Sequence, residues 1–159
     1  MPSSNRKICK VPVIIQLEMV ECGAASLAMI CAYHKKYLSL EQVRSDCGVS
    51  RDGSNVYNVV ECAKKYGLEA EAYTCEMSDL YNEVEYPCII HYGFNHFMVL
   101  RGITKKFAYV NDPARGELKI TIEEFNEKFT GIVVMFHEGE NFVPEGKPKS
   151  KFDFVGERI

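Results

Sequence analysis

The chain lacks an apolar run long enough to cross a bilayer, and outside its last segment it lacks any cluster of Lys and Arg. A membrane-spanning helix needs about 20 consecutive apolar residues, and the first residues also lack the apolar core of a secretory signal. The formal net charge of −3 gives no electrostatic footprint for a phosphate backbone. The sequence therefore predicts a soluble protein that stays in the cytoplasm and binds no nucleic acid.

Cysteine occurs seven times, but no two cysteines form a Cys-x-x-Cys pair. The odd number and the missing pair argue against a disulfide framework and against a zinc site. Most of the thiols are expected to be reduced and to pack as small hydrophobic groups. The cysteines are Cys9, Cys22, Cys31, Cys47, Cys62, Cys75 and Cys88.

One stretch of the chain predicts a helix that is buried on all sides. From Ala24 to Ala32 only Ser26 is polar, so no face of this helix is suited to water. The helix is expected to end near Tyr37. Cys22 falls in its first turn, where free backbone N–H groups and the helix dipole favour a nucleophilic thiolate. A buried, inert cysteine is an equally good interpretation of Cys22 from this stretch alone.

The rest of the first half also predicts helices. Ser39 and Gln42 form a capping box for a short helix that Gly48 closes. Ser54 is expected to cap a further helix, which Gly67 stops.

The second half predicts strands, because the hydrophobic period changes after Gly67.

The 159 residues fit one domain. Helices followed by an antiparallel sheet predict an α+β fold in which the buried helix packs on the sheet. The expected strands are 68–73, 87–92, 96–103, 107–111, 117–120 and 132–136, with one or two helical turns at 77–84 and a capped helix at 121–129.

The position of each histidine decides whether it can serve Cys22 as a base. His34 lies near the far end of the same helix, about 18 Å away at 1.5 Å per residue, and cannot reach. His91 is expected to pack or to face water, and His137 leads out of the last strand. His96 begins a strand, so its side chain can face the start of a helix from the margin of the sheet.

Two further polar residues complete a candidate site. Asp112 ends the next strand and is placed to hold the second nitrogen of His96, although on its own it is more typical of a turn before Pro113. Gln16 ends the apolar run before the helix, and its amide is placed to stabilise an oxyanion beside Cys22. The order nucleophile, base and carboxylate is that of papain-like cysteine peptidases.

These motifs resemble the peptidase C39 family, the papain-like domains at the N-terminus of peptidase-containing ABC transporters. The resemblance covers about residues 11–136 and rests on Gln16 and on the segments 21–29, 95–100 and 110–113. It implies that Cys22 is the nucleophile, His96 the base, Asp112 the orienting carboxylate and Gln16 the oxyanion donor.

The resemblance also implies a substrate and a setting. The family removes leaders from bacteriocin and lanthipeptide precursors by cutting after a Gly-Gly, Gly-Ala or Gly-Ser motif. The expected partners are the leader region and the membrane domain of an ABC transporter, at the cytoplasmic face of the membrane. The peptidase domain, residues 1–137, is expected to be a monomer without a cofactor, since ATP would bind only to a nucleotide-binding domain outside this chain. Residues 138–159 are expected to form a linker to the transporter.

Two alternatives stay open. Some C39-like domains have lost the cysteine and only dock the leader, but Cys22, His96 and Asp112 are all present here. A transglutaminase-like or amidase enzyme would share the Cys-His-Asp order without the spacing of Gln16 or the turn at Asp112.

Overall fold

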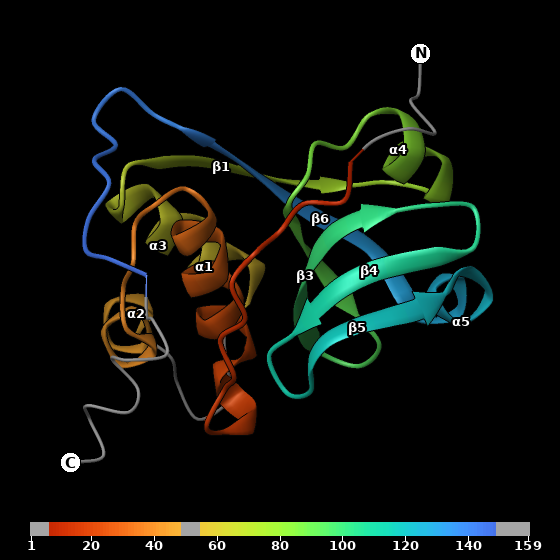
Figure 1. The fold of residues 1–159 in the computed structure, drawn as a ribbon, viewed down its shortest axis with the longest axis horizontal. Coiled ribbons are helices and arrows are strands. Elements are labelled where there is room, and N and C mark those ends of the chain that lie inside the picture. Colours follow the sequence, from red (N-terminus) through yellow and green to blue (C-terminus); the bar gives the residue numbers. More distant parts are fainter. Residues whose placement is uncertain (1–6, 49–54, 149–159) are drawn as a thin grey trace.

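The computed structural model describes residues 7–48 and 55–148. Helices α1, α2 and α3 gather beside a twisted sheet, and β1 and β6 extend from the sheet over the helices (Figure 1). The segment before α1 runs between the helices and the sheet, as its backbone bond from Cys9 N–H to Arg101 O shows. The predicted α+β layout, with a helical half packed on an antiparallel sheet, is confirmed.

The buried helix α1 comprises Cys22–Tyr33 and follows a 3-10 turn, η1, of Met19–Glu21. The predicted end near Tyr37 is wrong. Lys35 adopts a left-handed conformation with φ 71°. The N–H of Lys36 then bonds to Cys31 O at 2.8 Å, and this pairing closes the last turn and stops the helix.

The next two helices are α2, Leu40–Cys47, and α3, Val56–Lys65. The side chain of Ser39 caps α2 as predicted. The cap of α3 is Asn55, which accepts a bond from Asn58 N–H, and not Ser54, which lies outside the described residues.

A disulfide joins α2 to α3, although the number and spacing of the cysteines argued against a disulfide framework. Cys47 and Cys62 are bonded with their Cα atoms 5.2 Å apart. Their separation of 15 residues in sequence matches no short motif, so only the packing of the two helices brings them together. The other five cysteines are free thiols, as expected.

The sheet has six strands in the order β1-β6-β2-β3-β4-β5, and every neighbouring pair is antiparallel. All six predicted strands are present, although β6 is longer than its apolar run because it pairs with β1 on one side and β2 on the other. The short helices are α4, Met77–Asn82, and α5, Ile122–Lys128. The strands are β1 Leu68–Thr74, β2 Cys88–Tyr92, β3 His96–Ile103, β4 Phe107–Asp112, β5 Gly116–Thr121 and β6 Phe129–Glu138.

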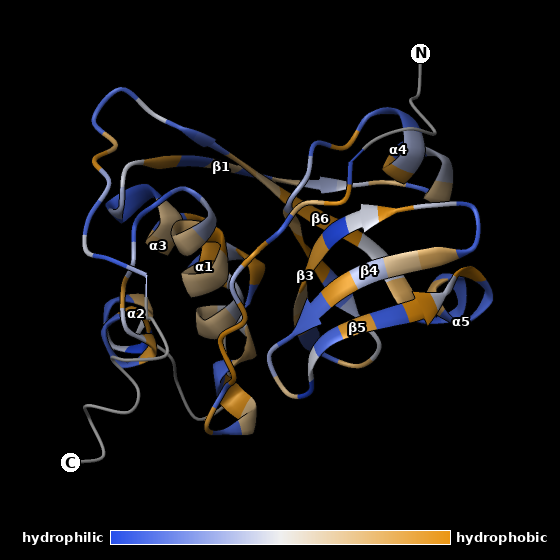
Figure 2. Ribbon diagram, viewed as in Figure 1, coloured by the Kyte–Doolittle hydropathy of each residue, from blue (hydrophilic) through white to orange (hydrophobic). Residues whose placement is uncertain are grey.

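Strand β3 is apolar on both faces because both are covered. Phe97 and Val99 belong to the core shared with α1, whereas Met98 and Leu100 belong to a second core with Phe125 of α5. Figure 2 shows apolar residues along α1 and the central strands, with hydrophilic residues on α2 and β5. A strand packed on both faces is held firmly, and the polar residue at its start is positioned with it.

Residues that follow β6 pack back onto the helical half. Gly139 N–H bonds to Gly67 O at 2.9 Å, and Tyr37 N–H bonds to Glu145 O at 2.7 Å. The ammonium of Lys36 donates to Val143 O at 2.8 Å. The first part of the segment predicted as a linker therefore touches the domain, and the boundary after residue 137 stays a prediction. Within the described residues, no helix combines the length and apolarity that crossing a membrane requires.

Candidate active site

Cys22 is the first residue of α1 and faces the sheet. Its side chain is nearly buried, at 5% exposure, and its Sγ accepts the backbone N–H of Phe97 on β3 at 3.4 Å. The predicted placement of a cysteine in the first turn of a buried helix is confirmed. Since Phe97 directly follows His96, this bond holds the sulfur beside the first residue of β3.

His96 and Asp112 meet because β3 begins where its antiparallel neighbour β4 ends. His96 Nε2 lies 2.8 Å from Asp112 Oδ1. Asp112 also accepts Ala114 N–H at 2.8 Å and Arg115 Nε–H at 3.2 Å. These donors fix the carboxylate, and the predicted contact between His96 and Asp112 is confirmed.

The surroundings of His96 and Asp112 favour an ion pair between a protonated ring and an ionised carboxylate. Hydrogen bonds to Asp112 and then to Cys22 raise the pKa of His96 from 6.5 to about 9, against the opposing effect of burial. Burial would raise the pKa of Asp112, but the bonds from His96, Ala114 and Arg115 hold it below 3.8. With Nε2 on Asp112, Nδ1 is the ring nitrogen left for Cys22. The three groups therefore form a chain from carboxylate to imidazole to sulfur.

Gln16 reaches the same margin of the sheet. Its backbone N–H donates to Pro113 O at 2.8 Å, one residue after Asp112. Its side-chain Oε1 is buried and has no hydrogen-bond partner among the described residues. The backbone of Gln16 therefore lies at the margin of the sheet that carries Asp112, and the role of its side-chain amide as oxyanion donor stays a prediction.

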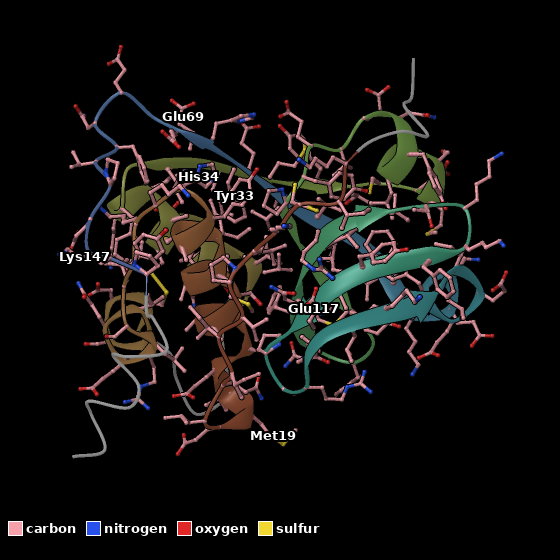
Figure 3. All side chains as sticks on the ribbon, viewed as in Figure 1. Met19, Tyr33, His34, Glu69, Glu117 and Lys147 are labelled. Carbon is pink, nitrogen blue, oxygen red and sulfur yellow. A yellow bond between two sulfur atoms is a disulfide. The ribbon has the colours of Figure 1, made fainter. Side chains whose placement is uncertain are left out.

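The other histidines bond elsewhere. His34 Nδ1 lies 2.9 Å from Glu138 Oε2, and Figure 3 shows His34 and Met19 at opposite ends of α1. His91 Nδ1 lies 3.0 Å from Thr130 Oγ1, and His137 Nε2 lies 2.6 Å from Glu85 Oε1. The prediction that His34 cannot serve Cys22 is confirmed.

Sequence reasoning missed one buried charge at the site. Glu21 is 1% exposed and pairs with Arg44 of α2. Its only signal in the sequence is its position directly before Cys22. Among the described residues no three His, Cys, Asp or Glu side chains form a group that could hold a metal ion.

A cysteine at the start of a buried helix, facing a histidine and a carboxylate on an antiparallel sheet, defines the class of papain-like cysteine peptidases. Within that class, the model of the peptidase C39 family matches residues 10–141. The chain belongs to the peptidase C39 family, in agreement with the resemblance noted in its sequence.

Two relatives from Escherichia coli are similar over 136 residues. They are the probable microcin-H47 secretion/processing ATP-binding protein MchF, at 36% identity, and the colicin V secretion/processing ATP-binding protein CvaB, at 35%. Each match covers 86% of this chain but only 19% of the relative. The chain therefore spans about a fifth of the length of these curated relatives.

Two similar solved structures are also a protease and a peptidase domain from transporters. A double glycine motif protease from an AMS/PCAT transporter, in complex with the leader peptide, is 59% identical with a TM-score of 0.80, over 83% of this chain and 94% of that one. The peptidase domain of Streptococcus ComA, a bifunctional ABC transporter, is 25% identical with a TM-score of 0.74, over 79% and 97%.

Proposed function

We propose that this chain is the leader peptidase of a peptidase-containing ABC transporter. It cuts ribosomal precursor peptides after a double-glycine motif of the Gly-Gly, Gly-Ala or Gly-Ser type. The observation that carries the proposal is the 2.8 Å contact of His96 with Asp112 beside the sulfur of Cys22. The leader peptide bound to the 59% identical protease supports the choice of substrate.

The reaction is an acyl transfer in two steps. His96 Nδ1 holds the proton of the Cys22 thiol, and Sγ attacks the carbonyl carbon of the second small residue. The amide of Gln16 donates to the oxyanion of the tetrahedral intermediate. His96 then protonates the departing amine, which frees the core peptide. A water that gives its proton to His96 hydrolyses the thioester and releases the leader.

Asp112 acts through His96. Its carboxylate fixes the ring so that Nδ1 points to the sulfur, and it stabilises the imidazolium from which the departing amine takes its proton. The acid is held in turn by Ala114 N–H and Arg115. None of these steps uses a cofactor.

The setting follows from the same proposal. In the complete protein the domain lies at the cytoplasmic face of the membrane, next to the transporter's membrane domain. Export of the core peptide is driven by ATP bound to a separate nucleotide-binding domain. The domain itself works as a monomer with the leader as its ligand. The processing and transport functions named for MchF and CvaB support this assignment.

The test is mass spectrometry of a Gly-Gly precursor after incubation with the wild type and with Cys22→Ala. The wild type should give one cut after the second glycine. Cys22→Ala should give none, because the attacking sulfur is gone, while it still binds the leader. Cys75→Ala, which removes a half-buried thiol just after β1 whose backbone N–H bonds to Gly131 O, should cut like the wild type.

The same incubation separates the alternatives. Binding without a cut by the wild type would indicate a docking domain, although the presence of Cys22 argues against it. Transfer of the peptide to an added amine donor, without hydrolysis, would indicate a transglutaminase-like enzyme. Cleavage by Cys22→Ala would overturn the assignment of the nucleophile.

A further inference from the structure

The carboxylate of Glu21 is buried directly before the nucleophile, yet the reaction does not use it. The residue is 1% exposed and forms the last position of η1, so Cys22 follows it without a gap. A buried charge is costly unless hydrogen bonds and a counter-ion compensate it. The partners of Glu21 therefore show what it holds in place.

The two carboxylate oxygens of Glu21 accept hydrogen bonds from different partners. Oε1 accepts the backbone N–H groups of Leu17 at 2.8 Å and Glu18 at 2.9 Å. Oε2 accepts Arg44 Nη1–H at 2.7 Å. Burial would raise the pKa of Glu21, but these bonds and the charge of Arg44 hold it below 4.5. The side chain is thus an anion that binds backbone on one side and α2 on the other.

The backbone that Glu21 binds begins at the residue after Gln16. Gln16 is itself tied to Pro113 by its own N–H. The chain around Gln16 is therefore fixed from both sides, by the sheet through Pro113 and by the start of α1 through Glu21.

Side-chain packing cannot replace this bond. Leu17 is 82% exposed and Met19 is 87% exposed, so the turn between Gln16 and Cys22 gains little from burial of its own side chains. The bonds to the Glu21 carboxylate hold this turn together with one backbone bond, from Glu21 N–H to Glu18 O at 3.1 Å.

We infer that Glu21 is a positioning residue, which sets the amide of Gln16 against the sulfur of Cys22, and that Arg44 keeps its charge in place. This inference rests on the proposed function, because it acts on the oxyanion step. Glu21 touches neither the substrate nor the reacting atoms. Its effect on the rate passes through Gln16, and this route makes the inference testable.

The experiment is a double-mutant cycle between Glu21→Gln and Gln16→Ala, measured as kcat and KM on a Gly-Gly precursor. Glutamine keeps the size of the side chain but loses the charge that binds Arg44 and both N–H groups. Glu21→Gln should lower kcat about 10- to 100-fold with little change in KM, since small misplacements of catalytic groups cost that much. In the Gln16→Ala background the same change should lower kcat by less than about 2-fold.

Two controls separate this route from a general loss of structure. Glu61→Gln removes an exposed carboxylate from a pair with Lys64 on α3 and should leave kcat and KM unchanged. Circular dichroism and thermal unfolding measure the folded fraction of every variant, and all rates are taken per folded molecule.

Arg44→Gln provides a second route, because Arg44 is 41% exposed and its loss is less disruptive than a change at Glu21. It should also lower kcat in the wild type but not in the Gln16→Ala background. The inference would be overturned if, in both cycles, the loss of kcat in the double variant equalled the product of the losses in the two single variants. An unchanged kcat in Glu21→Gln would overturn it as well. Failure of the wild type to cleave would instead overturn the proposed function.

Discussion

Asp112 carries more of the site's organisation than any other residue. It is almost fully buried, at 3% exposure, and it takes bonds from His96, Ala114 and Arg115. A buried carboxylate with three donors stays ionised. Its charge therefore orients the imidazole and also raises the proton affinity of the ring.

Removing that charge should change His96 in a measurable way. Asp112→Asn keeps an oxygen that can accept from the ring but loses the ionic attraction. The pKa of His96, raised to about 9 in the wild type, should fall by about 1–3 units. NMR titration of the ring protons of His96 measures this. An unmoved His96 midpoint would contradict the role given to Asp112.

The same pair predicts a pH window for stability. The folded pKa of His96 is raised, so its contribution is full below 6.5 and is lost as the pH rises through about 9. The folded pKa of Asp112 is lowered, so its contribution is present above 3.8 and is lost as the pH falls through the folded value. The difference in unfolding free energy between wild type and Asp112→Asn should thus be largest between pH 3.8 and pH 6.5. Chemical denaturation at several pH values measures it.

At the scale of helices and strands, local chemistry predicts most helix caps, but not the boundaries that backbone conformation or pairing partners set. The Ser39 and Thr121 caps lie where the sequence places them, because a cap needs only neighbouring residues. The end of α1 depends on Lys35 in a left-handed conformation, for which the residue type gives no warning. Strand β6 exceeds its apolar run because pairing partners extend it. Such partners are not visible in a local pattern.

Gly67 illustrates an element boundary that depends on distant chain. It ends α3 with φ +87°, and a Cβ placed there would lie 2.9 Å from the backbone Cα of Phe142. Gly93 has φ +60° but meets nothing within 4 Å among the described residues. Gly67→Ala should therefore lose at least about 1 kcal/mol more stability than Gly93→Ala. Thermal unfolding compares the two, and equal losses would show that the segment at Phe142 moves aside freely.

At the scale of the whole molecule, the site lies between two halves that the sequence separates widely. Cys22 comes from the helical half and the His96–Asp112 pair from the sheet (Figure 1). Residue order and family motifs were enough to predict that Cys22, His96 and Asp112 meet, whereas their catalytic roles and that of Gln16 stay predictions. The pairing of Glu21 with Arg44 and the Cys47–Cys62 bond could not be predicted. Both depend on how α2 packs against its neighbours, and no motif encodes that packing.

The segment before α1 joins the two halves, and Asn111 fastens it to the sheet. Its Nδ2 donates to Val11 O at 2.9 Å, and the residue is fully buried. Farther along, Gln16 N–H bonds to Pro113 O. We expect the bond from Asn111 to Val11 O to keep the segment in place for the bond from Gln16 to Pro113 O. Loss of the Asn111 amide should then loosen Gln16, although among the described residues Asn111 makes no hydrogen bond to Gln16 or to Cys22.

Asn111→Ala should therefore lower the free energy of unfolding and expose the backbone N–H of Gln16. Val11 O would be left buried without its donor, at a cost of about 1–3 kcal/mol. Hydrogen exchange at Gln16 N–H should become faster by more than the global loss of stability explains, because the segment opens locally, and kcat should fall while KM changes little. Asn126→Ala on the exposed face of α5 should change none of these quantities. Unaltered exchange at Gln16 N–H in Asn111→Ala would mean that the bond from Asn111 to Val11 O does not hold this part of the segment.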